Sequence, residues 1–296
     1  MIAQYENKVM SSMLLYLDNQ ICSKGEAYTN LTNQTIYPID SNSEVYHSGN
    51  LTVYPFHIYA LPYKQIIIDE SITGANICKG VTIDGVYSTP NGNPANGDFQ
   101  SILHHKGQFL FVDDQDSSTL TVSCAVKDFN IYISSKFEED LLLKTAFQTN
   151  PKISQTLAGL PDETETFPAI FLKNMGGENQ PLALGQRAHN VITRIRAVVM
   201  ADSAFNLDAV CNILKNTKED NLPILEPGNL PFDSIGGYTG VIYDYSIESA
   251  AATEKATIWN VSVTRLNPNS SGLKNIHAEV HSAFVDFEVH GIGKNT

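Results

Sequence analysis

Two histidines and two aspartates form the most suggestive group of metal-ligand side chains in the sequence. His104-His105 is followed by Asp113-Asp114, and imidazole and carboxylate groups both bind transition metals. Adjacent side chains on a strand point to opposite faces of the sheet, so His104 and His105 would not converge on one ion. His277 and His281 have helical spacing but lack the glutamate that follows the first histidine in zinc proteases. We therefore predict no metal-binding residues.

Two other segments resemble ligand-binding loops but lack their essential residues. Residues 114–118 resemble the start of a calcium loop, yet Thr119 stands where glycine is needed and Ala125 where glutamate is needed. The glycine-rich segment 236–240 lacks the Lys-Ser/Thr pair of a phosphate-binding loop, and we interpret it as a turn. Gly176-Gly177 is predicted to open a loop.

The four cysteines are far apart in the sequence and form no CxxC pair. Cys124 lies in an alternating apolar stretch and Cys211 on an apolar helix face, so both are predicted to be reduced core residues. Cys22 and Cys78 have lysines nearby but no histidine that could act as a base. With no other catalytic motif present, we predict that the chain is not an enzyme and has no catalytic or cofactor-binding residues.

Arginines and tyrosines supply the remaining candidates for recognition. Arg187, Arg194 and Arg196 form a small basic patch, with Arg194 and Arg196 on one strand face. Two interpretations stay open, and surface ion pairs are favoured over a contact with an acidic segment of a neighbouring subunit, such as 162–165. A ligand-binding groove would need exposed aromatic side chains. The candidates are Tyr59, Tyr63, Tyr243 and Tyr245, of which the last two are predicted to be core residues because they share a strand face with Val241.

The composition limits the classes of partner. The net charge is −13, and no run of lysine and arginine exists, which disfavours binding to a nucleic-acid backbone. An acidic wall past which DNA slides without binding fits this charge, as does an acidic surface that keeps the protein soluble. Only 17% of the residues are charged, which indicates either a surface partly covered by a partner or a polar, uncharged one.

Targeting signals are not evident in the sequence. Residues 1–8 lack the basic and apolar regions of a signal peptide, and no apolar run approaches the ~20 residues that span a bilayer. We therefore expect synthesis in a cytoplasm and no membrane partner.

Apolar spacing predicts a first helix followed by a long β-rich block. Ile2, Tyr5, Val9, Met13, Leu17 and Ile21 recur every three or four residues, so residues 1–22 are expected to form an amphipathic helix that Gly25 ends. Strands are then expected between residues 34 and 134. Their predicted ranges are 34–39, 51–60, 65–69, 81–88, 108–112, 120–126 and 129–133, with a loop at 89–98 and a bulge or bend near Lys127-Asp128.

The second half mixes helices and strands. Ser135 to Glu138 resembles a capping box for a helix at 136–147, and the segment 148–167 is expected to be a linker or an arm that orders against a partner. A strand–helix–strand unit is expected at 190–225, with Asp202 or Ser203 as the helix cap. One face of its helix is expected to carry the apolar residues Leu207, Val210, Cys211 and Leu214. Further strands are predicted at 168–174, 238–246, 257–265 and 283–291. The inward-facing residues of the last two are expected to be Trp259, Val261 and Val263 in one and Val285, Phe287 and Val289 in the other.

These elements predict an α+β, β-rich fold. It comprises an N-terminal amphipathic helix, a β-barrel or sandwich block, and a strand–helix–strand unit with a mixed or antiparallel sheet. The expected organisation follows the chain in four ranges. They are an N-terminal helix at 1–30, a β-rich block at 31–135, a short helix and arm at 136–167, and an α+β block at 168–296.

The order of the elements and three segments resemble neck proteins of tailed bacteriophages, which include head–tail joining (connection) and tail-terminator proteins. The segments are 127–132, 168–172 and 198–203. The resemblance implies a virion protein that forms a homo-oligomeric ring of six-fold or twelve-fold symmetry and connects the portal to the tail. Its partners would be other neck, portal and tail proteins, and DNA would pass through the lumen without specific binding. The large 35–134 block favours the joining type over a minimal tail terminator.

Two alternatives stay open at this point. One is another virion component, such as a tail-tube, baseplate or capsid-decorating protein. The other is a carbohydrate- or ligand-binding β-module. If the chain is a neck protein or another virion component, its expected location is the virion, after synthesis in the cytoplasm of a bacterial host.

Overall fold

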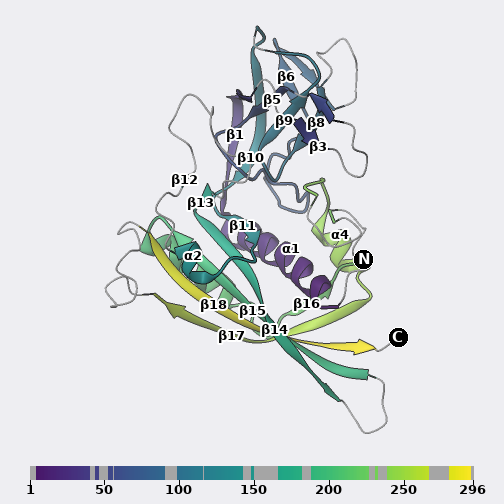
Figure 1. The fold of residues 1–296 in the computed structure, drawn as a ribbon, viewed down its shortest axis with the longest axis vertical. Coiled ribbons are helices and arrows are strands. Elements are labelled where there is room, and N and C mark those ends of the chain that lie inside the picture. The colour runs from purple at the N-terminus through teal and green to yellow at the C-terminus, as the bar shows by residue number, and fades with distance from the viewer. Residues whose placement is uncertain are drawn as a thin grey trace. The chain divides into compact units, whose positions relative to one another are not determined.

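The computed structural model shows two compact units that interleave along the chain (Figure 1). Unit 1 comprises Met1–Ala27, Phe129–Phe147 and Phe167–Thr296, and unit 2 comprises Tyr28–Asp128 and Gln148–Thr166. This grouping differs from the four consecutive ranges expected from the sequence. The structure describes residues 5–40, 44–46, 53–55, 57–90, 99–115, 117–142, 148–149, 166–181, 188–226, 231–232, 239–266 and 280–294.

Unit 2 contains two four-stranded antiparallel sheets, which confirms the predicted barrel- or sandwich-like block. The first has the order β1-β10-β6-β7 and the second β2-β5-β9-β8. Apolar side chains from both sheets share one core, as Tyr59 and Phe111 on one side and Val122 and Cys124 on the other illustrate. The strands are β1 (Tyr28–Thr35), β2 (Tyr37–Asp40), β5 (His57–Ala60), β6 (Val81–Ile83), β7 (Val86–Ser88), β8 (Phe99–Leu103), β9 (Gln108–Phe111) and β10 (Leu120–Lys127), besides the short pairs β3 (Glu44–Tyr46) with β4 (Val53–Pro55) and β12 (Gln148–Thr149) with β13 (Thr166–Phe167).

Unit 1 is built on a six-stranded sheet with the order β11-β14-β15-β18-β17-β16. Only the β11–β14 pair is parallel, and the other pairs are antiparallel. The strands are β11 (Asn130–Ile133), β14 (Ala169–Pro181), β15 (Ala188–Ala201), β16 (Asn221–Ile224), β17 (Glu254–Arg265) and β18 (His281–Lys294). The helices are α1 (Tyr5–Gly25), α2 (Glu138–Leu142), α3 (Ala204–Lys215) and α4 (Tyr245–Ala251). None of the helices in the described residues is long and apolar enough to cross a membrane.

Helix α1 is the central buried element of unit 1. It ends at Gly25, as the sequence predicts, and its burial extends beyond the predicted apolar stripe. Every residue from Val9 to Asp18 is buried, so the helix lies within the unit rather than on its surface. Two of its polar side chains bond to residues beside β16: the Leu225 N–H donates to Ser12 Oγ at 2.8 Å, and the Tyr16 hydroxyl donates to Asp220 Oδ2 at 2.6 Å. Burial and the neighbouring Asp220 carboxylate both raise the pKa of Tyr16.

The strand–helix–strand unit predicted at 190–225 is confirmed as β15, α3 and β16. Ser203 is the N-cap of α3, and its Oγ accepts a hydrogen bond from the Asn206 N–H at 3.1 Å. The apolar stripe of α3 is buried as expected, and it consists of Leu207, Val210, Cys211 and Leu214.

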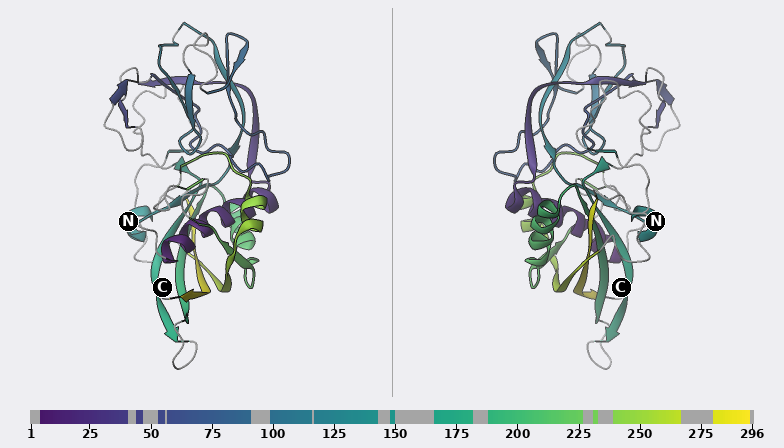
Figure 2. Two further views of the ribbon diagram at one scale, coloured as in Figure 1. Left: turned by 90° about the vertical axis from the view of Figure 1, so that its right-hand side faces the viewer. Right: turned by 90° about the vertical axis from the view of Figure 1, so that its left-hand side faces the viewer.

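The two faces of the unit 1 sheet have different covers. Helices α1 and α3 pack on one face, where Ala197 and Val285 are fully buried (Figure 2). Helix α2 lies on the opposite face, where Leu141 and Leu142 form an apolar cluster with Phe171, Val198 and Met200. We call this second side the α2 face. Beyond the cluster, the α2 face is lined by charged side chains.

Several predicted elements differ from the structure. The predicted strand 238–246 was wrong, because Tyr245 begins helix α4 and Asp244 caps it. The predicted strand 65–69 forms no strand and has isolated bridges, such as that from Ile66 to Val126, while strand β8 was not predicted. The bend predicted near Lys127-Asp128 is present at residues 128–129, where the chain crosses from β10 in unit 2 to β11 in unit 1.

Two local motifs also differ, and some expectations cannot be compared. Helix α2 begins at Glu138, so Ser135 is not its cap. The side-chain hydrogen bond in this segment runs from the Lys136 N–H to Ser134 Oγ. Gly176-Gly177 lies within β14 at a register shift, where Gly176 has φ +82° and a Cβ on Gly177 would lie 2.1 Å from the Ile192 carbonyl oxygen. The 89–98 loop and the 148–167 arm lie almost wholly outside the described residues, as do Ile2, residues 143–147, the segment 236–238 and His277.

The helix caps give a direct test of this part of the fold. Ser203→Ala removes the acceptor for the Asn206 N–H, so we expect the free energy of unfolding to fall by about 1 kcal/mol. Ser135→Ala is the matched control, because Ser135 is exposed and caps no helix, and it should stay within about 0.5 kcal/mol of the wild type. Urea unfolding followed by circular dichroism measures both. Equal losses in the two variants would contradict the assignment of the cap.

Candidate functional site

A row of charged side chains crosses three strands on the α2 face of unit 1. Lys173 on β14 is opposite Arg196 on β15, and Arg196 is opposite Asp286 on β18. Arg196 donates two hydrogen bonds to the Asp286 carboxylate, from Nε to Oδ1 at 2.6 Å and from Nη2 to Oδ2 at 3.0 Å. The Asp286 carboxylate is the main cause of the raised pKa of Arg196. This fork geometry fixes both side chains more firmly than a single ion pair would.

Glu138 of helix α2 forms ion pairs with two members of this row, Lys173 and Arg196. Lys173 and Arg196 are neighbours of like charge, which is destabilising unless an anion lies between them. The Glu138 carboxylate supplies it: Oε2 lies 2.7 Å from Lys173 Nζ and Oε1 lies 3.4 Å from Arg196 Nη1. Its hydrogen bond with Lys173 is the main cause of the lowered pKa of Glu138. One carboxylate therefore joins α2 to two strands.

The predicted basic patch forms ion pairs within the chain, as the favoured interpretation held. Arg194 Nη2 lies 3.1 Å from Glu178 Oε1, and both side chains are about half exposed. Arg196 is paired as described above. Arg187 and the acidic segment 162–165 lie outside the described residues.

Trp259 projects onto the α2 face, contrary to the prediction that it faces inward. A register shift between Ile258 and Asn260 reverses the alternation, so Ile258 and Val261 are buried while Trp259 is 59% exposed. The indole stacks on the His290 imidazole, with ring centroids 5.3 Å apart and planes 25° apart. His290 Nε2 in turn lies 2.6 Å from Glu288 Oε1. The bulge thus presents a large aromatic ring to solvent on a fixed support.

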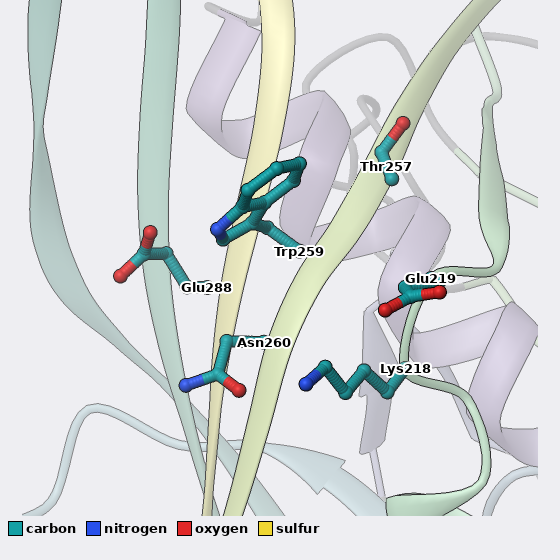
Figure 3. Close-up of a pocket in the computed structure, with 6 residues that line it drawn as sticks. All are labelled: Lys218, Glu219, Thr257, Trp259, Asn260 and Glu288. Atoms are coloured by element: carbon teal, nitrogen blue, oxygen red, sulfur yellow. The ribbon is translucent and has the colours of Figure 1, made fainter.

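Two adjoining depressions lie on this face and share Asn260 and Glu288. One, of about 400 Å³, lies over the Arg194–Arg196 segment of β15. The other, of about 560 Å³, lies beside Trp259 (Figure 3). Its further lining residues are Lys218, Glu219 and Thr257, of which the first two come from the turn that follows α3. The depressions combine one aromatic ring with both donors and acceptors.

Strand β14 presents an open edge over half its length. Its first four residues pair with β11, and within the described residues no strand pairs with the free edge from Lys173 to Pro181. Residues from Asn174 to Pro181 are all exposed, and Met175 is 44% exposed. An unpaired, exposed edge is a template for another strand.

Strand β17 presents a second open edge at the other side of the sheet. Its first four residues pair with β16, and Ile258 exchanges hydrogen bonds with the turn residues Glu219 and Asp220. From Asn260 to Arg265 the described residues provide no strand partner on that edge. The two open half-edges, Lys173–Pro181 and Asn260–Arg265, belong to one sheet but differ in sequence and surroundings.

The sequence candidates for metal chemistry and for a tyrosine-lined groove lie elsewhere, in other environments. His104 is buried in unit 2, with Nε2 2.8 Å from the Cys78 carbonyl oxygen, and Asp114 accepts a hydrogen bond from the Tyr59 hydroxyl at 3.0 Å. Among the described residues, no group of three or more His, Cys, Asp and Glu side chains is placed to hold a metal ion. Tyr59, Tyr243 and Tyr245 are buried, as predicted for the last two, so they form no exposed aromatic groove.

The cysteines are all buried and form no disulfide. Burial raises the pKa of the Cys78 thiol to about 12 and that of Cys211 to about 11, and it also raises the pKa of Cys124. A thiol with a raised pKa is protonated at neutral pH and is a poor nucleophile. These three thiols therefore act as core residues.

The Glu138 contact predicts a specific dependence of stability on pH. Because folding lowers the pKa of Glu138, its contribution is complete above its unfolded pKa of about 4.3 and is lost as the pH falls through the lower folded value. We expect Glu138→Gln to lower the free energy of unfolding by about 1 kcal/mol at neutral pH. The difference from the wild type should shrink in acid, as measured by urea unfolding at several pH values.

Glu178→Gln is the matched control, since its pair with Arg194 is about half exposed and should contribute little. A Glu138→Gln variant as stable as the wild type at neutral pH, or a loss that persists unchanged in acid, would contradict this role of Glu138.

Recognition groups of three kinds therefore share the unit 1 sheet: a charged row, an exposed indole and two open half-edges. The sequence predicted the ion-pairing arginines, but it gave no signal for the carboxylates that pair with them, since those residues are 16 to 90 positions away. The bulge at Trp259 and the two edges emerge only from strand pairing. No family model matches the chain, and a search of curated proteins finds no match.

Proposed function

We propose that this chain is a structural protein of the tailed-bacteriophage virion, a ring-forming subunit of the neck between the portal and the tail. The observation that carries the proposal is the pair of open half-edges on the unit 1 sheet. Two different edges on one sheet allow each copy to offer β14 to one neighbour and β17 to the other. Such a head-to-tail interface generates a ring where the rotation closes.

The strand directions are compatible with this pairing. Three successive antiparallel pairs connect β14, β15, β18 and β17, so β14 and β17 run in opposite directions. The β14 edge of one copy placed beside the β17 edge of the next would therefore form an antiparallel pair and keep the α2 faces of both copies on one side. Main-chain hydrogen bonds would supply affinity, as in other cases of strand addition.

The three segments that resemble neck proteins lie on neighbouring strands of one sheet. The segments, 127–132, 168–172 and 198–203, contribute β11, the start of β14 and the end of β15. Ile131 is opposite Ile170, and Phe171 is opposite Val198, so these strands are direct neighbours in the sheet. Segments that are distant in the sequence thus belong to one contiguous part of unit 1.

In the proposed ring the chain does its work by geometry and not by catalysis. The net charge of −13 suits a channel through which DNA passes without being bound, with portal, tail and other neck proteins as partners above and below. The open edges also suit a tail-tube or other virion ring, so location in the particle distinguishes these virion assignments.

Blocking the edges tests the head-to-tail interface. Proline removes a backbone N–H, and one of any two successive residues on an edge strand directs its N–H outward. We would therefore prepare Asn179→Pro and Gln180→Pro for β14, and Ser262→Pro and Val263→Pro for β17, and keep the variant of each pair that retains the wild-type melting temperature. Each retained variant should be monomeric alone, whereas an equimolar mixture of the two should form dimers through the unblocked edges and stop there. Light scattering coupled to size exclusion measures these masses.

Three outcomes would contradict the proposal. A wild-type chain that stays monomeric at high concentration would exclude a self-assembling ring, and rings of unchanged size in both blocked variants would exclude these edges. Dimers formed by either blocked variant alone would indicate that each edge pairs with itself. Electron microscopy of phage particles labelled at this chain must place the label at the neck, and a label on the tail tube, baseplate or capsid would reassign it.

A further inference from the structure

The depression beside Trp259 has the composition of a small polar-ligand site. We infer that it binds a saccharide, with a pyranose ring stacked on the exposed indole face. This inference goes beyond the proposed assembly role, because a saccharide would contact side chains on the α2 face, whereas the proposed subunit contacts use main-chain groups along the strand edges. Asn260, where the open half-edge of β17 begins, belongs to both.

The indole is both exposed and held in place. One face stacks on His290, and His290 is fixed by its contact with Glu288, yet 59% of the Trp259 surface remains accessible. A rigid aromatic ring offers a large contact area at little cost in conformational entropy. The apolar C–H face of a sugar ring is a flat surface of matching size, so stacking would remove both surfaces from water.

The rim supplies the polar contacts that sugar hydroxyls need. Glu219 and Glu288 carry acceptors, Lys218 carries donors, and Asn260 and Thr257 carry both. Figure 3 shows Trp259, Asn260 and Glu288 grouped over β17 and β18, with Lys218 and Glu219 across from them. A hydroxyl group donates and accepts, so a polyhydroxylated ring can use a rim of mixed character.

A cationic side chain is the rival occupant, since indoles and carboxylates also attract guanidinium groups. Two features favour the neutral saccharide. The Glu288 carboxylate already has His290 within hydrogen-bonding distance, and the Lys218 ammonium on the same rim offsets the attraction of the Glu219 carboxylate for a cation. The depression, of about 560 Å³, is also larger than one guanidinium needs and lies in the range of small-molecule sites.

The sequence makes this site directly observable, because Trp259 is the single tryptophan of the chain. Tryptophan fluorescence should change saturably when the full chain is titrated with methyl glycosides of glucose, galactose or N-acetylglucosamine, or with their trisaccharides. Saturation-transfer NMR of the same sugars gives a readout that does not depend on the tryptophan. By that method Trp259→Ala should weaken binding at least about tenfold, and Asn260→Ala by about as much.

Phe205→Ala is the matched control, because Phe205 is an exposed aromatic residue on α3, 81% exposed, and does not line the depression. It should leave sugar binding unchanged. A saturable response to arginine methyl ester but to none of the sugars would overturn the inference in favour of a cation site. Absence of any saturable response, or equal binding by Trp259→Ala and the wild type in NMR, would overturn it entirely. Recording the particle mass in the same samples separates this outcome from failure of the ring proposal.

Discussion

Burial of helix α1 is the constraint from which the arrangement of unit 1 follows. Its buried stretch from Val9 to Asp18 is continuous, and α1 packs with α3 on one face of the six-stranded sheet. Hydrogen bonds from Tyr16 to Asp220 and from Leu225 to Ser12 tie α1 to both ends of β16. Recognition in unit 1 is therefore left to the α2 face and to the strand edges.

The α2 face is itself divided by how far β11 and α2 extend. Next to β11 the sheet carries Phe171, Val198 and Met200, and α2 covers them with Leu141 and Leu142. One row further, the alternation of the same strands presents Lys173, Arg196 and Asp286 instead. Glu138 lies at the boundary, where the first turn of α2 reaches these cations. A single acidic residue thus couples the position of a short helix to the charged part of the sheet.

The sequence predicted elements well where one periodicity holds throughout. The α3 stripe with its Ser203 cap and the alternation of Val285, Phe287 and Val289 were both readable, because burial on one face imposes a regular pattern. It failed where tertiary structure overrides local pattern. Helix α1 is buried around its circumference, so the apolar stripe described only part of its contacts. At Tyr243 and Tyr245 the alternation indicated a strand, but the Asp244 carboxylate caps a helix there, accepting from the Ser246 and Ile247 N–H groups.

The candidate site was harder to predict, since its features depend on register. One bulge residue in β17 turns Trp259 from an expected core residue into an exposed one, and no composition signal marks that shift. The partners of Arg196 come from α2 and β18, which only the folded sheet brings together. The low content of charged residues was visible in the sequence, but the distribution of those residues over the sheet was not.

The distribution of charged side chains distinguishes the two open half-edges from ordinary exposed strand edges. Natural sheets usually protect such edges with charged side chains, especially lysine. Lys173 and Arg265 lie on the open halves of β14 and β17, yet Lys173 pairs with Glu138 and Arg265 with Asp208, both on the faces of the sheet. The other residues of these two open segments are uncharged except Glu178, which pairs with Arg194 on the neighbouring strand. Neither edge is therefore strongly guarded by charge against a partner strand, which is the condition that assembly through them requires.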